Sequence, residues 1–180
     1  LIVDEIQTGI GRTGKFWGFE HFKIIPDIII SGKGLGGGMP IGAFIAQKKL
    51  MDVLKEHPTL GHITTFGGHP VIASAGLATV NTIQNSTLIE DTLEKEQLIR
   101  SLLKHPLIKE IRGKGLMLAV LVESPEIVAK IIHRCLANGL ILFFLLFEGR
   151  AIRITPPLTI SKKEISKGCK ILLEILDELS

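Results

Sequence analysis

Short apolar runs separated by glycine-rich turns dominate the first fifty residues, a pattern typical of strands rather than helices. One run ends at Asp4, and Ile28–Ile30 is continuously apolar, as expected of a strand buried on both faces. A third run, 41–46, follows a tight Gly-Gly-Gly-Met-Pro turn, so we expect it not to continue a parallel order. If the first two strands are adjacent and parallel, they end at the same rim of one sheet, where open α/β sheets bind ligands.

The middle of the chain changes to a helical pattern. We expect a helix near 49–56 and a loop over 58–68. Pro70 begins a helix that runs to about Gln84, and Thr87-Leu-Ile-Glu90 fits a capping box for a further helix to about residue 104.

The last third mixes strands and helices. Residues 108–122 predict two short strands hinged at Arg112-Gly-Lys-Gly115, and residues 140–147 and 151–155 predict two more. Two helices have clear start signals, Ser124-Pro-Glu126 and the capping box Ser161-Lys-Lys-Glu164, and the first stops at Asn138-Gly139. The last helix has one apolar face, which consists of Ile165, Cys169, Leu172, Leu176 and Leu179.

These elements predict an α/β fold in two parts, with residues 1–85 as the C-terminal part of a larger α/β domain and residues 86–180 as a small α+β domain. The chain opens at Leu1 inside a buried-strand pattern, with no methionine and no preceding cap. We therefore expect it to be a fragment whose N-terminal part is missing.

Composition excludes several classes of protein. With 46% hydrophobic and 22% charged residues the chain has the composition of an ordinary globular protein. Its net charge of +3 is small and its basic residues are scattered, which does not suggest a nucleic-acid partner. The apolar run 140–147 is too short for a membrane span, so we interpret it as a buried strand. The absence of a leader predicts a cytoplasmic location, where Cys135 and Cys169 would be buried free thiols.

Lys33 is the strongest candidate for chemistry. It follows an apolar strand and is surrounded by glycines, which let the backbone approach a planar ligand closely, although a solvated loop lysine is the alternative. Gly32, Gly34 and Gly37 match the spacing of a dinucleotide motif, but a strand follows where that motif needs a helix. An amine that forms an imine and an acid, here Asp4, that keeps a ring nitrogen protonated are the protein's two contributions to pyridoxal phosphate chemistry. The alternative for Asp4 is an acid at a strand end that only caps the following turn.

The longer segments around these residues carry a resemblance. Ile-Val-Asp-Glu-Ile-Gln-Thr-Gly, Gly-Arg-Thr-Gly-Lys-Phe and Pro-Asp-Ile-Ile-Ile-Ser-Gly-Lys-Gly-Leu-Gly-Gly-Gly-Met-Pro-Ile-Gly-Ala closely resemble the core of class III pyridoxal-phosphate aminotransferases of the ornithine, acetylornithine and 4-aminobutyrate type. The similarity continues in order through Thr64–Pro70, Arg112–Met117 and Arg153–Thr159, and so covers essentially the whole chain.

The resemblance implies a fold and a cofactor site. The fold would be that of the type I, aspartate-aminotransferase-like enzymes. Lys33 would be the Schiff-base lysine, Asp4 would pair with the pyridine nitrogen of pyridoxal 5'-phosphate, and Gln7 would contact the ring hydroxyl side. Thr65 would reach the cofactor phosphate of the other subunit of a homodimer, although a turn residue bonded to local backbone is the alternative.

Arg153 is the candidate for substrate binding. In the strand 151–155 it shares a face with Ala151 and Thr155, and a guanidinium there could grip a carboxylate through two parallel hydrogen bonds. The resemblance makes it the anchor of the substrate α-carboxylate; the alternative is a structural ion pair. Arg112 we assign to structure. The six histidines show no ligand spacing, so no metal site is expected, and His69 stands where the family often has asparagine.

The predicted function is a transaminase that moves an amino group from an amino acid or amine to a 2-oxo acid such as 2-oxoglutarate. A class III aminomutase or decarboxylase is the alternative within the same chemistry. An inactive relative that only forms dimers is the alternative outside it. The sequence does not specify the amino donor.

Overall fold

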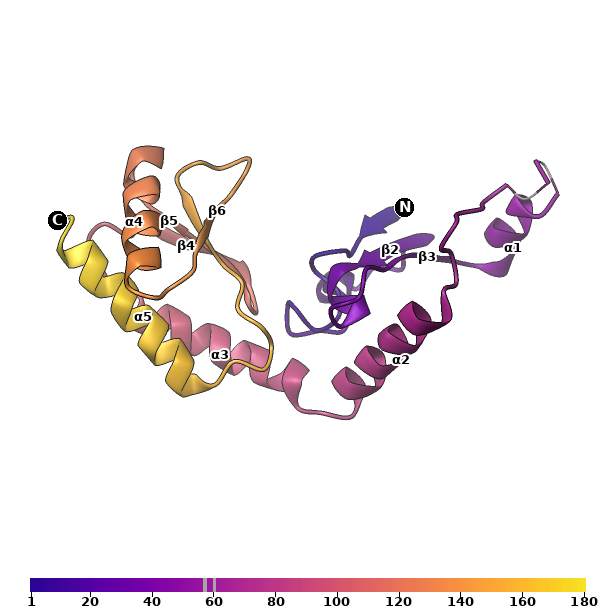
Figure 1. Ribbon diagram of the computed structural model, residues 1–180, viewed down its shortest axis with the longest axis horizontal. Helices are drawn as coiled ribbons and strands as arrows, with labels where there is room; N and C mark the ends of the chain where they lie inside the picture. Colours follow the sequence, from indigo (N-terminus) through magenta and orange to yellow (C-terminus); the bar gives the residue numbers. More distant parts are fainter. Residues whose placement is uncertain (57, 60) are drawn as a thin grey trace. The chain divides into compact units, whose positions relative to one another are not determined.

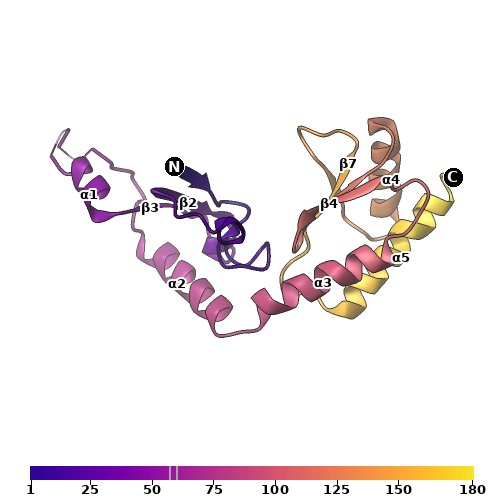
Figure 2. The ribbon, with the colours of Figure 1, turned by 180° about the vertical axis from the view of Figure 1, so that it is seen from behind.

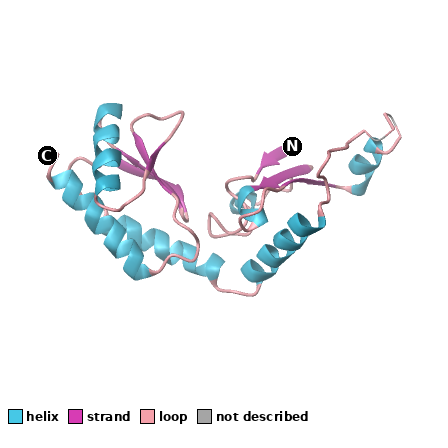
Figure 3. Cartoon of the chain, in the orientation of Figure 1, coloured by secondary structure: helices cyan, strands magenta, loops and turns pink. Residues whose placement is uncertain are grey.

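The computed structural model describes residues 1–56, 58–59 and 61–180. The chain divides into two compact units, Leu1–Thr87 and Leu88–Ser180. Helices and strands occur in both units (Figure 3). None of the described helices is both long and apolar enough to cross a membrane.

The first unit is built on a sheet of three strands in the order β1-β2-β3 (Figure 1). The strands are β1 (Ile2–Asp4), β2 (Ile28–Gly32) and β3 (Gly42–Ala46). β1 and β2 are parallel, whereas β3 runs antiparallel to β2, which confirms that the third strand does not continue the parallel order.

The expectation that Ile28–Ile30 is buried on both faces is wrong for this chain. These residues are only half-buried, and Ile2 of the neighbouring strand is 61% exposed. The sheet lies beside an open hollow of about 1110 Å³, whose walls include Ile2, Ile30 and Phe44. Apolar content predicted the strand correctly, but burial depends on what lies against the sheet, which a local pattern does not encode.

Helices and single turns complete the first unit. They are the 3-10 turns η1 (Gly18–Phe22), η2 (Lys33–Gly36) and η3 (Asp52–Leu54), the short helix α1 (Lys48–Met51) and the long helix α2 (Pro70–Gln84). α2 has the predicted bounds, with proline in its first turn. The helix expected near 49–56 is only one α-helical turn followed by a 3-10 turn. Leu50 and Val53 in this segment are exposed, so it buries no apolar face that would stabilise a longer helix. Residue 60 of the expected loop 58–68 lies outside the described residues.

The second unit contains a four-stranded antiparallel sheet with three helices (Figure 2). The strand order is β4-β5-β7-β6, and the strands are β4 (Glu110–Lys114), β5 (Met117–Leu121), β6 (Phe143–Phe144) and β7 (Ala151–Ile154). The helices are α3 (Leu88–Leu102), α4 (Pro125–Ala137) and α5 (Lys162–Asp177).

The predicted helix signals of α4 and α5 are confirmed. The Ser124 hydroxyl accepts a hydrogen bond from the backbone N–H of Ile127 at the start of α4, and Gly139 follows its end in the left-handed conformation with φ of 79°. At α5, Ser161 and Glu164 form the reciprocal capping box. These short-range bonds satisfy N–H groups that the helix itself leaves free.

Two predictions in the second unit are wrong. The hairpin predicted to hinge at 112–115 turns at Gly115-Leu116 instead, because Arg112, Gly113 and Lys114 pair with β5 and Leu116 is fully buried. The predicted buried strand 140–147 contributes only the two residues of β6. Its side chains are largely outside the core, and Phe147 is fully exposed.

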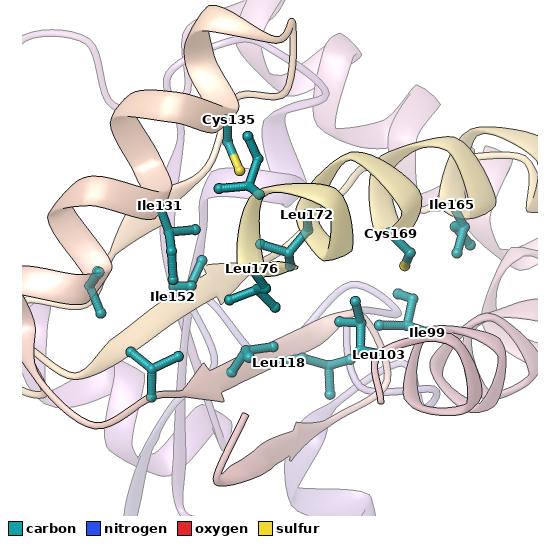
Figure 4. Close-up of a cluster of buried hydrophobic side chains, with 14 of the residues drawn as sticks. Ile99, Leu103, Leu118, Ile131, Cys135, Ile152, Ile165, Cys169, Leu172 and Leu176 are labelled. Atoms are coloured by element: carbon teal, nitrogen blue, oxygen red, sulfur yellow. The ribbon is translucent and has the colours of Figure 1, made fainter. Parts of the chain in front are cut away.

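The core of the second unit lies between one face of the sheet and the helices. Leu118 and Ile152 from the sheet meet Ile131 of α4, Leu172 and Leu176 of α5, together with side chains from α3 (Figure 4). All the predicted apolar positions join this core as buried or partly buried side chains, four of them in α5 and Leu179 just after its end. Cys135 and Cys169 are buried free thiols there, and burial raises the pKa of each to about 11.

Candidate active site

Asp4 and Lys33 lie at the same rim of the first unit's sheet. Asp4 is the last residue of β1 and is paired in register with Ile30 of the parallel strand β2. Lys33 follows directly after β2. The structure therefore brings together the two strand ends that the sequence placed side by side, with an exposed carboxylate and an exposed amine.

Local hydrogen bonds fix the backbone after Asp4. One oxygen of the Asp4 carboxylate, Oδ1, accepts the N–H of Ile6 at 3.0 Å, and the backbone N–H of Glu5 donates to Ile30 O at 2.8 Å. The turn that begins here is thus held to β2.

Lys33 has an unusual backbone conformation. Its φ is 43°, in the left-handed region that few residues other than glycine adopt. Such a conformation costs about 1–3 kcal/mol and persists only where surrounding structure enforces it, typically at functional sites. This conformation occurs at the point where β2 ends and η2 begins.

The glycine-rich loop is also packed against the protein itself. Gly37 has φ of 56°, and a Cβ atom on it would lie 2.3 Å from the hydroxyl oxygen of Thr79 in α2. The left-handed φ and the close approach to α2 both favour glycine at this position, directly after η2. Beside the lysine, a Cβ on Gly34 would meet only the side chain of Ile10, at 3.7 Å. Gly37 in this loop thus serves packing within the first unit.

Glu5 is a buried acid that the sequence pattern did not single out. It is only 3% exposed, and its carboxylate accepts three hydrogen bonds: from Gly18 N at 2.8 Å, Phe19 N at 2.7 Å and Thr8 Oγ1 at 2.6 Å. This carboxylate ties the loop 8–19 to the end of β1, next to Asp4. The only signal in the sequence was a second acid directly after the strand-end acid, which by itself does not reveal burial.

The loop that Glu5 anchors packs behind the lysine. Ile10 in this loop is 5% exposed and has a left-handed φ of 57°, which is rare for a β-branched residue. Burial of Arg12 lowers the pKa of its guanidinium. The strained and buried loop gives the rim a rigid support.

Gln7 and Thr65 are exposed residues of the first unit. Gln7 lies in the turn three residues after Asp4, and Thr65 lies in the turn 65–68 before α2. Ile63 and Phe66 beside Thr65 are 71% and 73% exposed. His69 occupies the position before the first residue of α2 and makes no side-chain capping bond there.

Arg153 belongs to the second unit, whereas Lys33 belongs to the first. It lies in β7, opposite Phe143 of β6, and its guanidinium carbon is 5.2 Å from the centre of the Phe143 ring. Its Nε atom is buried and has no hydrogen-bond partner among the described residues. The structural ion pair that the sequence left open as an alternative is not formed within the described part of the chain.

Comparison with known proteins identifies the family. The family model for class III aminotransferases matches residues 1–176. The chain belongs to the class III aminotransferase family. It is 40% identical to acetylornithine aminotransferase from Caldanaerobacter subterraneus subsp. tengcongensis and covers 45% of that protein with 99% of its own length. It is also 40% identical to leucine/methionine racemase from Thermococcus litoralis, over 93% of this chain and 40% of that protein.

Solved structures agree with the family assignment. An ornithine aminotransferase from Toxoplasma gondii, described with partial occupancy of PLP at its active site, matches with a TM-score of 0.88 and 33% identity, over 99% of this chain and 42% of that one. This confirms the α/β fold of the pyridoxal-phosphate-dependent transferases. The chain spans less than half the length of these relatives.

The residues present fit the family's cofactor, pyridoxal 5'-phosphate. A carboxylate and an amine end adjacent strands at one rim, and the amine stands on a backbone held in a strained conformation. A carboxylate that can bind a ring N–H and an amine that can bond to an aldehyde carbon are the groups this cofactor needs. No group of three or more His, Cys, Asp and Glu side chains that could hold a metal occurs in the described ranges.

Proposed function

We propose that the protein carrying this chain is a pyridoxal-phosphate-dependent transaminase that transfers an amino group to a 2-oxo acid such as 2-oxoglutarate. The observation that carries the proposal is the position of Asp4 and Lys33 at the ends of two adjacent parallel strands. Membership of the class III family supports it.

Each site residue has a distinct role. The carboxylate of Asp4 accepts a hydrogen bond from the ring N–H and keeps that proton in place, and Gln7 contacts the ring hydroxyl side. When bound, the cofactor supplies a sink for the electrons left when a proton leaves the substrate α carbon. Lys33 Nζ holds the cofactor covalently between turnovers and acts as the base that takes and returns this proton. Arg153 holds the substrate carboxylate through its N–H edge.

The two units correspond to two parts of a transferase subunit. We assign 1–85 to the C-terminal part of the large cofactor-binding domain and 86–180 to the small C-terminal domain. We also propose a homodimer in which Thr65 reaches the partner subunit's cofactor phosphate. The exposed apolar side chains on both sides of Thr65 support an interface there, because water-exposed Ile63 and Phe66 gain by burial. Two unpaired cysteines support a reducing, cytoplasmic setting.

A second candidate is racemisation of an amino acid, which the similarity to leucine/methionine racemase favours. Lys33 would perform the same proton removal, and no amino acceptor would be consumed. A coupled assay separates the two: a transaminase produces glutamate from 2-oxoglutarate, whereas a racemase inverts its substrate without any acceptor.

The deciding experiment is borohydride reduction of the complete protein after incubation with pyridoxal phosphate, followed by peptide mapping. We expect one pyridoxyl adduct, on Lys33, which disappears in Lys33→Ala. Asp4→Asn should retain the adduct but lose most turnover, because the ring nitrogen is no longer held protonated. Adducts spread over surface lysines, or no adduct, would overturn the cofactor site and favour an inactive relative.

A further inference from the structure

The second unit contains a cavity of about 480 Å³ next to Arg153. Pairing between β6 and β7 stops at Phe143 and Arg153, and the segments 140–142 and 155–157 beyond this pair line the cavity together with one side of α5. Pro156 and Pro157 have no backbone N–H, so β7 cannot continue the ladder. The cavity is therefore an opening that the end of strand pairing creates, and its size is typical of small-molecule sites.

Arg153 supplies the positive charge at this cavity. Its Nε is buried without a partner among the described residues, and its guanidinium carbon lies 5.2 Å from the centre of the Phe143 ring. A buried N–H donor with no acceptor is costly, and a carboxylate satisfies it through two parallel bonds to the guanidinium edge. Contact with the ring fixes the guanidinium from one side and leaves its edge for such a ligand.

The other walls are mostly apolar. They include Leu140, Leu142, Ile154, Ile160 and Leu172. Cys169 also lines the cavity. Because burial raises the pKa of its thiol to about 11, this side chain is uncharged at physiological pH. Glu164 is an acidic lining residue, and its carboxylate oxygen Oε2 accepts hydrogen bonds from Ser161 N at 2.8 Å and Ser161 Oγ at 2.7 Å in the capping box.

We propose that this cavity binds the apolar tail of a ligand whose carboxylate is held by Arg153. The inference rests on the proposed function and names the class of amino donor: an amino acid with an aliphatic or thioether side chain, rather than one with a second charged group. A charged tail would lose its water in this cavity, where the polar side chains besides Arg153 are Thr155 and a Glu164 carboxylate already bound in the capping box.

Carboxylates without an amino group test this directly. They cannot react, so their binding is measured without turnover, whether or not the cofactor is bound. Ligand-observed NMR titration of the complete protein with acetate, butyrate and hexanoate should show affinity rising about fourfold for each methylene buried. Hexylamine, which is a cation at neutral pH, should bind at least tenfold more weakly than hexanoate. Equal affinities along the series, or hexylamine as tight as hexanoate, would overturn the proposal.

Gly168 offers a matched pair of variants for the tail. It lines the cavity on α5, and a Cβ there would lie 3.5 Å from Leu140 Cδ1, which is ordinary contact. Gly168→Leu should fill the cavity and weaken hexanoate at least tenfold while acetate is unchanged, whereas Gly168→Ala should have little effect. Both replacements have a higher helix propensity than glycine, so neither weakens α5 through its backbone. Unchanged hexanoate binding in Gly168→Leu would place the tail elsewhere.

Arg153→Gln tests the carboxylate end. It should weaken acetate and hexanoate alike by at least tenfold and remove the preference for hexanoate over hexylamine. Retention of that preference would show that another group holds the anion. The Lys33 adduct is mapped independently, so failure of the cavity to bind apolar tails leaves the proposed chemistry standing, and absence of the adduct does not affect the binding result.

Discussion

Glu5→Gln tests the hydrogen-bonded support of the candidate active site. Glu5 is 3% exposed, and all three of its partners, Gly18 N, Phe19 N and Thr8 Oγ1, donate to it. A glutamine side chain has one acceptor oxygen and one NH2 group. The NH2 group must therefore face at least one backbone N–H, to which it cannot offer an acceptor. The best arrangement places the NH2 group next to the N–H of Phe19, because the Thr8 hydroxyl and the Gly18 N–H then still donate to the glutamine oxygen.

The expected cost follows from these bonds. Loss of one charge-assisted bond costs about 1.5–3 kcal/mol, and the remaining two weaken because their acceptor is no longer charged. We therefore expect Glu5→Gln to lower the free energy of unfolding of the first unit by about 3 kcal/mol. Since the carboxylate is buried, solvent does not reduce this effect appreciably.

Trp17 provides the assay. It is the single tryptophan of the chain and lies beside the bonds in question, with Phe16 and Phe19 around it. Urea denaturation followed by its fluorescence reports unfolding of the first unit. The matched control is Glu20→Gln, because the exposed Glu20 accepts a single hydrogen bond from Trp17 N at 2.7 Å. This replacement should lower the free energy of unfolding by less than about 1 kcal/mol. If Glu5→Gln is no more destabilising than this control, the anchoring role of Glu5 is refuted.

Three further predictions concern the second unit. Leu172→Ala, in the buried core, should destabilise it by about 2–5 kcal/mol in urea denaturation followed by circular dichroism, while Leu136→Ala, at a 59% exposed position, should change stability by less than about 0.5 kcal/mol. Gly113→Ala should cost about 3 kcal/mol in the same assay, because φ is 109° and the new Cβ would lie 2.0 Å from Met117 O; wild-type stability would contradict that geometry. The thiols of Cys135 and Cys169, whose pKa values burial raises to about 11, should react slowly with a disulfide reagent at pH 8 until the protein is unfolded. Because the unfolded state loses these protons first, near pH 9, stability should decline as the pH rises from about 9 to 11, and rapid labelling of the native protein would argue against burial.

Local signals accounted for much of the fold. The bounds of α2 and the capped starts of α4 and α5 follow from residues within one helical turn, because caps and proline act on neighbouring backbone groups. Strand ends followed in the same way, so the pattern of apolar runs and glycines was enough to predict Asp4 and Lys33 at one rim. The acid and the amine at this rim are therefore the part of the candidate site that the sequence could predict.

Other features depended on contacts between distant segments. The run 140–147 is apolar enough for a buried strand, yet only Phe143 and Phe144 pair, and both are more than half exposed. Apolar content indicates that burial would be favourable, but it does not say whether another surface is present to bury it. The hairpin turn was misplaced for a related reason: residues 112–114 of the predicted hinge pair with β5, so the chain turns only at Gly115-Leu116, where Leu116 is buried in the core.

What the sequence by itself determined is the order of elements and the chemical groups at the strand ends, because both are written in short-range patterns of polarity, glycine and proline. What only the tertiary structure decided is which polar groups find partners. Glu5 is satisfied by N–H groups thirteen and fourteen residues away, whereas Arg153 Nε is buried beside a cavity with no partner in the described ranges. A hydrogen bond depends on distance in space, and the chain sets that distance only when it folds.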